Sequence, residues 1–148
     1  MVSGAQENTR RRSRERALSL LYEAEMKGYD PGDVLKDQPM QPDGFARTLV
    51  ERTTDSREET DALISSASLG WPLERMAVVD RLILNMSATE LLDPDGAPTA
   101  VVIDEAVELA KIYSTEESGS FINGILSTLA ASVRDVAPEE SPEESTGS

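Results

Sequence analysis

Five arginines fall within positions 10–16, which read Arg-Arg-Arg-Ser-Arg-Glu-Arg. This window carries five positive charges and one negative charge, although the 148-residue chain has a formal net charge of -14. Guanidinium groups bind phosphates through charge and paired hydrogen bonds, and their planes stack on unpaired bases. A polyanion is therefore the expected ligand of this arginine cluster, which comprises Arg10, Arg11, Arg12, Arg14 and Arg16. The alternative is a solubilising helix end that pairs with the protein's own carboxylates.

Other residue types that perform chemistry are missing from the chain. It has no histidine and no cysteine, which excludes a Ser-His-Asp or Cys-His nucleophile, a thiolate zinc site and a disulfide framework. Glu105 and Glu108 lie at helical spacing, but a di-iron helical site would also need Glu-x-x-His. For this pair we expect a solvated acidic face. The sequence thus predicts a protein that is not an enzyme and holds no cofactor and no metal.

The spacing of the apolar residues is helical almost throughout, and no convincing run of alternating β-branched residues interrupts it. The apolar content of 39% suffices for one core. We therefore expect an all-α fold, a single compact domain of about seven helices over residues 10–134. The segment 76–92 is apolar on nearly all sides, which predicts a central helix.

Both ends of the chain differ from this pattern. Residues 1–9 are small and polar, and the last part of the chain is rich in Pro, Glu, Ser and Gly. We expect residues 1–9 and an acidic tail over 135–148 to be disordered. No run approaches the roughly 20 apolar residues that span a bilayer, and nothing at the start resembles a secretory signal. The expected location is cytoplasmic, without membrane insertion.

The first helix is expected from about residue 11 to residue 27. Its apolar stripe is formed by Ala17, Leu20, Leu21 and Ala24. Arg10 and Arg14 fall on the same side of the helix as this stripe. Because a charge cannot be buried without a partner, we expect this end of the helix to project beyond the core.

Four motifs in the chain occur in an order and spacing seen in one protein family. They are the arginine cluster leading into residues 17–24 (ALSLLYEA), then residues 79–84 (VDRLIL), 103–111 (IDEAVELAK) and 121–126 (FINGIL). The chain resembles the NusB family of transcription antitermination factors over residues 10–132. The acidic and apolar helix followed by Phe-x-Asn-Gly is the most specific of these motifs.

The resemblance implies an all-helical fold of two small antiparallel bundles. It also implies a role in bacterial transcription antitermination, as an RNA-binding factor acting with the transcription elongation complex. The implied ligands are the single-stranded boxA segment of nascent ribosomal RNA and ribosomal protein S10. A monomer and a homodimer both remain open.

Carried over by position, the family's RNA-facing residues fall on the arginine cluster, Lys111 and Phe121. Many relatives have a basic residue before this phenylalanine, where the present chain has Ser120, so weaker RNA binding is expected. Tyr22 and Asp80 match positions that the resemblance associates with S10.

Several of these assignments have a structural alternative. Phe121 is either a stacking platform for a base or an extension of the core stripe beside Ile122 and Ile125. Asp80 lies in the most apolar helix, so its carboxylate either pairs with an internal arginine or reaches a surface where S10 binds. For the whole protein, the alternative is a helical protein-interaction module that binds a basic partner without RNA.

Overall fold

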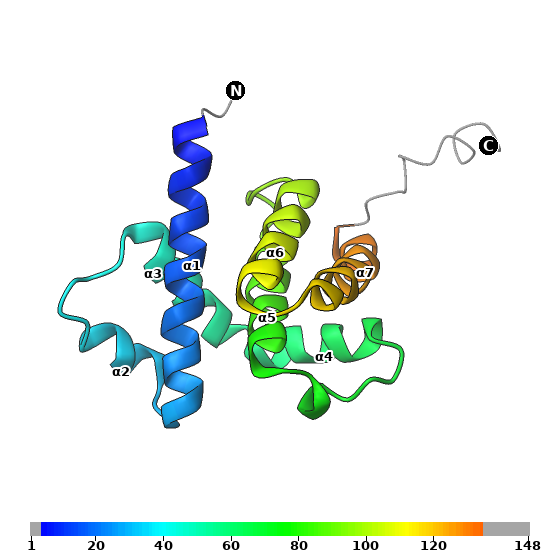
Figure 1. Ribbon diagram of the computed structural model, residues 1–148, viewed down its shortest axis with the longest axis horizontal. Helices are drawn as coiled ribbons and strands as arrows, with labels where there is room; N and C mark the ends of the chain where they lie inside the picture. Colours follow the sequence, from blue (N-terminus) through cyan, green and yellow to red (C-terminus); the bar gives the residue numbers. More distant parts are fainter. Residues whose placement is uncertain (1–3, 135–148) are drawn as a thin grey trace.

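The computed structural model describes residues 4–134, and the side chains of residues 9–134. The described part contains seven α-helices, one short 3-10 helix and no strand, which confirms the all-α fold (Figure 1). None of its helices is long and apolar enough to cross a membrane. The helices are α1 (Gly4–Lys27), α2 (Pro31–Lys36), α3 (Gly44–Asp55), α4 (Arg57–Ala67), η1 (Leu73–Arg75), α5 (Val78–Leu92), α6 (Thr99–Tyr113) and α7 (Glu116–Val133).

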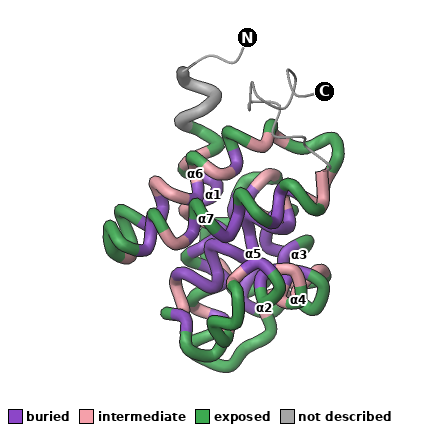
Figure 2. Tube along the Cα trace, turned by 90° about the vertical axis from the view of Figure 1, so that its right-hand side faces the viewer, coloured by how far each residue is buried: buried purple, intermediate pink, exposed green. Residues whose placement is uncertain are grey.

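The helices form two small bundles that share α5. In the first bundle α1 packs against α2 and α3, and in the second α4, α6 and α7 surround α5, which also touches α1 and α3. Eleven of the fifteen residues of α5 are buried, as expected for a helix that is apolar on nearly all sides (Figure 2). Because α5 contacts both bundles, its polar side chains lie where they can bind residues from either one.

Side-chain caps define the beginning of two helices, α3 and α7, which border the candidate site described below. Asp43 caps α3 by accepting a 2.8 Å hydrogen bond from the backbone N–H of Ala46. Thr115 caps α7 by accepting a 3.0 Å bond from the N–H of Ser118. Asp43 also accepts a hydrogen bond from the hydroxyl of Ser13, so the cap of α3 is tied to the arginine-rich part of α1.

The first helix begins earlier than the sequence analysis predicted. It starts at Gly4 instead of near residue 11, so residues 4–9, which were expected to be disordered, are helical. This stretch contains Ala, Gln and Glu, which favour helices, and no proline that would stop one. The N-terminal turns of α1 consequently extend past α3 (Figure 1). The remainder of the expected disorder, residues 1–3 and the acidic tail over 135–148, lies outside the described residues.

Arg134, directly after α7, holds the turn between α5 and α6. Its guanidinium group donates five hydrogen bonds of 2.9–3.1 Å, to the carbonyls of Glu90, Leu91, Asp93 and Ala97 and to the hydroxyl of Thr99. These carbonyls lie at the end of α5 and in the following turn, where helical hydrogen bonding ends; those of Glu90 and Asp93 also accept from the backbone N–H groups of Asp93 and Gly96. One side chain thereby fixes the turn that borders the larger cavity described below.

Candidate nucleic-acid interface

The arginine cluster is spread around α1 instead of forming one face. Successive residues of a helix are rotated by about 100°, and accordingly Arg10 and Arg12 are exposed, Arg11 and Arg16 are half-buried and Arg14 is buried. Arg12 makes no hydrogen bond or ion pair within the described part of the chain. Only part of the cluster is therefore directly available to a ligand.

Arg11 is bound to a carboxylate of a distant helix. Its Nε and Nη2 donate hydrogen bonds of 3.0 and 2.9 Å to the two carboxylate oxygens of Glu105 on α6. These hydrogen bonds and the opposite charges raise the pKa of Arg11 and lower the pKa of Glu105. The side chain of Glu105 is only 15% exposed whereas that of Arg11 is 42% exposed. The prediction of a solvated acidic face is therefore wrong for Glu105, but Arg11 remains accessible from solvent.

Arg14 lies inside the protein. Its Nε and Nη2 each donate a 2.8 Å hydrogen bond to one carboxylate oxygen of Glu90 on α5, and the residue is only 4% exposed. The expectation that this end of the helix projects beyond the core is wrong at Arg14, because Glu90 neutralises a charge that could not otherwise be buried. Arg14 thus anchors α1 to α5 and presents almost no surface to a polyanion.

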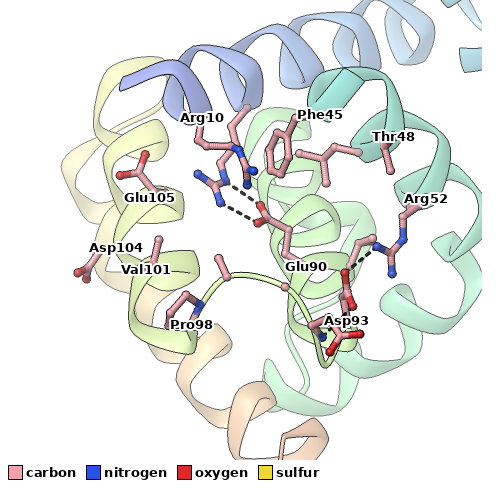
Figure 3. A pocket seen from close by; sticks show the side chains of 16 residues that line it. Arg10, Phe45, Thr48, Arg52, Glu90, Asp93, Pro98, Val101, Asp104 and Glu105 are labelled. Carbon is pink, nitrogen blue, oxygen red and sulfur yellow. Dashed lines mark hydrogen bonds and ion pairs between the residues drawn. The ribbon is translucent and has the colours of Figure 1, made fainter. Parts of the chain in front are cut away.

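A cavity of about 670 Å³ opens beside the arginine cluster, between α1, α3, α6 and the turn after α5 (Figure 3). The guanidinium carbon of Arg10 lies 4.3 Å from the centre of the Phe45 ring, and that of Arg14 lies 5.3 Å from it. These are cation–π distances. The sequence analysis did not single out Phe45 as a functional residue, because an aromatic residue in the first turn of a helix is more simply interpreted as core.

The walls of this cavity carry both signs of charge. Arg52 donates a 2.8 Å hydrogen bond to Asp93 (Figure 3), and the Arg14–Glu90 pair lines the same cavity. Arg10 is an exposed residue whose guanidinium group lies over the Phe45 ring. A planar group with polar edges fits such a cavity better than a bare phosphate, because the carboxylates repel an anion.

Arg16 contributes to the first bundle as well as to the cluster. Its Nη2 donates hydrogen bonds of 2.7 Å to the carbonyl of Met40 and 3.2 Å to the side-chain oxygen of Gln38. These contacts hold the loop between α2 and α3 against α1. Because they involve only one nitrogen of the guanidinium group, other N–H groups of Arg16 remain free to bind a phosphate.

Lys111 lies in the last turn of α6, beside the first turn of α7. Two other residues of α6 interact with α1: Glu105 pairs with Arg11, and Tyr113 lies close enough to Glu15 for the charge of Glu15 to act on it. Burial, followed by the nearby charge of Glu15, raises the pKa of Tyr113. Lys111 is exposed, and its Nζ lies 3.8 Å from a carboxylate oxygen of Glu108. The charge of Glu108 also contributes to the raised pKa of Arg11, so this carboxylate lies between Lys111 and the arginine cluster electrostatically.

Phe121 is half-buried and packs against the core, as its structural alternative expects. It lies in the second turn of α7, whose first turn rests on α6: a Cβ added at Gly119 would lie 3.7 Å from the Cγ of Lys111. Within the described residues, no cation stacks on Phe121. Its role as a platform for a base stays a prediction.

The two residues expected to meet a protein partner differ in exposure. Tyr22 is 40% exposed, whereas Asp80 is 7% exposed and accepts a 2.8 Å hydrogen bond from the hydroxyl of Ser118. Asp80 does not pair with the neighbouring Arg81, which instead donates to Glu25 of α1 at 2.9 Å. The expected pair with an internal arginine is therefore absent among the described residues, and the second oxygen of Asp80 has no hydrogen bond there.

Comparisons with known proteins identify the family and support the fold. The model of the NusB family matches residues 11–131. The chain is 41% identical to the transcription antitermination protein NusB of Kineococcus radiotolerans, over 82% of the chain and 92% of that protein. The structure of T. maritima NusB superimposes with a TM-score of 0.75 at 34% identity, covering 95% and 97% of the two chains. A crystal structure of the antitermination factors NusB and NusE with double-stranded RNA matches with a TM-score of 0.72 at 26% identity, covering 84% and 98%.

Proposed function

The chain belongs to the NusB family, and from this premise we propose that it is a transcription antitermination factor that binds boxA RNA of nascent ribosomal RNA together with ribosomal protein S10. The observation that carries this proposal is the set of accessible arginines on α1, Arg10, Arg11 and Arg12. Lys111 supports it, because Glu108 of α6 acts on both Lys111 and Arg11. The related complex of NusB with NusE, which is S10, and RNA supports both classes of ligand.

The residues of the proposed RNA site have different tasks. Arg10, Arg11, Arg12, Arg16 and Lys111 neutralise phosphates and release counterions. The exposed side of the Arg10 guanidinium, and the exposed part of the Phe121 ring, stack on unpaired bases. Arg14 is a positioning residue, because its buried pair with Glu90 holds the arginine-rich turn in place.

The proposed protein partner binds a different surface, near Tyr22 and Asp80. S10 is a basic ribosomal protein in this proposal, and an acidic chain of net charge -14 attracts it electrostatically. Tyr22, which is 40% exposed, is the residue of this pair that a partner reaches directly, and Asp80 supports the surface from inside through its hydrogen bond with Ser118. Acting in the cytoplasm on the transcription elongation complex, the protein would need binding alone, with no catalytic step.

Fluorescence anisotropy with labelled boxA RNA tests this function. The full chain is titrated into boxA RNA and into a shuffled RNA of equal length, each with and without S10. We expect tighter binding to boxA and a further gain when S10 is present, since two ligands that touch strengthen each other reciprocally. Binding of S10 without any RNA binding would instead support the protein-interaction module.

A further inference from the structure

The turn between α6 and α7 is held by a carboxylate of another helix. Only Ser114 and Thr115 separate the two helices, and both carry hydroxyl groups. Ser118, in the first turn of α7, adds a third hydroxyl, and its Oγ donates a 2.8 Å hydrogen bond to the Oδ2 of Asp80. Asp80 belongs to the first turn of α5, which packs against both α6 and α7. The hydroxyls of the turn thus lead to one buried acid of the central helix.

These hydroxyls form a chain of hydrogen bonds with one direction. Because a carboxylate only accepts, the proton of Ser118 Oγ points to Asp80. The same oxygen accepts a 3.0 Å hydrogen bond from Thr115 Oγ1, and the Oγ of Ser114 lies 3.0 Å from it as a second donor. With its proton directed at Ser118, Thr115 Oγ1 presents a lone pair to the N–H of Ser118, which is the cap of α7. Asp80 therefore determines how the cap is oriented.

The bond to Ser118 is the one hydrogen bond that Asp80 makes through its side chain in the described part of the chain. Asp80 is 7% exposed and Ser118 is 9% exposed. The other carboxylate oxygen, Oδ1, has no hydrogen bond there, and the neighbouring Arg81 pairs with Glu25. A negative charge is favoured in the first turn of a helix by the helix dipole. Asp80 is thus buried where its charge is tolerated, and it is tied to α7 through Ser118.

The first turn of α7 also supports Lys111. Gly119, the residue after Ser118, is buried, and a Cβ added there would lie 3.4 Å from Cγ1 of Val107. The same Cβ would lie 3.7 Å from Cγ and 3.9 Å from Cε of Lys111. The backbone of the turn therefore lies against the aliphatic part of the Lys111 side chain, which is 49% exposed. A displacement of this turn would change where the charge of Lys111 is held.

The position of Phe121 depends on the same turn. Phe121 follows Ser118 by three residues, so the two side chains lie about one turn apart on the same side of α7. The ring is half-buried against the core. A rotation of the first turn about the helix axis would move the part of the ring that remains accessible.

We propose that Asp80 is a positioning residue of the RNA site, which holds the first turn of α7 through Ser118 and so places Lys111 and Phe121 relative to each other. This inference rests on the proposed function. Asp80 is too deeply buried to touch RNA itself. Its effect on RNA binding passes through the hydrogen bond to α7.

Fluorescence anisotropy of the full chain with boxA RNA, without S10, tests the proposal. Asp80→Leu removes the acceptor and leaves an apolar side chain in an apolar helix. We expect RNA affinity to fall about five- to tenfold, as for one weakened stacking contact. Asp80→Asn keeps an oxygen that accepts from Ser118 and should bind RNA within about twofold of wild type. Equal losses in the two variants, or no loss in either, overturn the proposal.

Ser118→Ala tests the same hydrogen bond with a smaller change of volume. It removes the donor to Asp80, and we expect the same five- to tenfold loss of RNA affinity. Ser127→Ala is the matched control, because it removes an exposed serine hydroxyl farther along α7 and should stay within about twofold of wild type. Equal RNA affinities of Ser118→Ala and Ser127→Ala contradict the proposal.

Double variants show whether the effect passes through α7. If it does, Ser118→Ala and Phe121→Ala disturb the same contact, so their losses should not multiply. The double variant should bind no more than about twofold more weakly than the weaker single variant. The losses of Ser118→Ala and Arg12→Ala, which lies on α1, should multiply. This difference between the two pairs is not expected of a general loss of structure, which would affect both in the same way.

The outcomes also separate this inference from the proposed function. If wild type does not bind boxA RNA, the RNA part of the function fails and the inference fails with it. The function stands and the positioning role is rejected if wild type binds RNA but the losses of Ser118→Ala and Phe121→Ala multiply. The same conclusion follows if Phe121→Ala binds RNA like wild type.

Discussion

Arg11 of α1 and Glu105 of α6 form an ion pair with two hydrogen bonds, although 94 positions separate them in the sequence. The guanidinium group that is proposed to meet a phosphate is thus already bound to a carboxylate of the same chain. RNA must compete with Glu105 for Arg11, or bind the half of this side chain that faces solvent.

Competition predicts that Glu105→Gln tightens RNA binding. A partly exposed ion pair contributes up to about 1 kcal/mol, so the gain should be about two- to fivefold at low salt. Asp104→Asn is the matched control, because it removes an adjacent exposed carboxylate that has no ion pair in the described residues. Anisotropy titrations of both variants check this prediction, and a gain no larger for Glu105→Gln than for Asp104→Asn would argue against competition.

The buried pair between Arg14 and Glu90 predicts a large loss of stability when one partner is removed. Arg14→Ala leaves the Glu90 carboxylate only partly exposed and without its ion pair, which should cost about 3–5 kcal/mol of unfolding free energy. Arg12→Ala, at an exposed position, should change the unfolding free energy by less than about 0.5 kcal/mol. Urea unfolding measures both changes.

The double variant Arg14→Met with Glu90→Leu provides the control for this prediction. Replacing both charges by apolar side chains should recover most of the lost stability, because no unpaired charge remains. The structural assignment of Arg14 would be untenable if Arg14→Ala were as stable as Arg12→Ala.

The hydrogen bonds of Arg134 predict that the turn after α5 becomes less stable when this residue is replaced. Arg134→Ala leaves the carbonyls of Leu91 and Ala97 without a donor and removes one of two donors from those of Glu90 and Asp93, so we expect a loss of about 2 kcal/mol or more in unfolding free energy. Amide hydrogen exchange should also become faster at residues 93–97. Arg75→Ala, at an exposed arginine, is the control. Unchanged exchange in the turn would show that other contacts hold it.

The cap of α3 predicts a dependence of stability on pH. The hydrogen bonds from Ser13 and from the N–H of Ala46 lower the pKa of Asp43. Because the pKa of Asp43 is lower in the folded state, the carboxylate contributes its full stabilisation at pH values above the unfolded-state pKa of about 3.9. This stabilisation is lost as the pH falls through the folded-state pKa. Asp43→Asn keeps an acceptor for the cap and should therefore lose less stability than wild type below about pH 4.

Thermal unfolding between pH 2 and pH 6 checks this prediction. Asp55→Asn, which changes an exposed carboxylate at the other end of α3, should keep the wild-type dependence on pH. If the stability of wild type and of Asp43→Asn changed in parallel with pH, Asp43 would not contribute to the pH dependence of stability.

Local features of the fold were predictable from the sequence. The burial of α5 followed from apolar residues around its whole circumference. The arginine cluster was visible because its members are neighbours in the chain. The start of α1 was missed, because residues 4–9 lack the apolar periodicity that reveals a helix packed on a core.

The partners of the cluster could not be predicted in this way. Glu90 lies 76 positions from Arg14, and Phe45 belongs to a different helix from Arg10. Such pairs depend on the angle and register at which helices pack, and helical periodicity specifies only which face is apolar. A sequence can therefore identify a basic helix end, while only the packed structure distinguishes Arg14, which supports the helix, from Arg12, which faces solvent.

The dependence of RNA affinity on salt tests the central claim most directly. Each phosphate contact on a single strand contributes about -0.7 to the slope of log K against log salt concentration. BoxA RNA is titrated with wild type and with the double variant Arg11→Ala and Arg12→Ala. For the double variant we expect weaker binding and a slope that is flatter by about 1.4, because two phosphate contacts are lost. The same slope and affinity for both proteins would contradict the assignment of the arginine cluster to RNA.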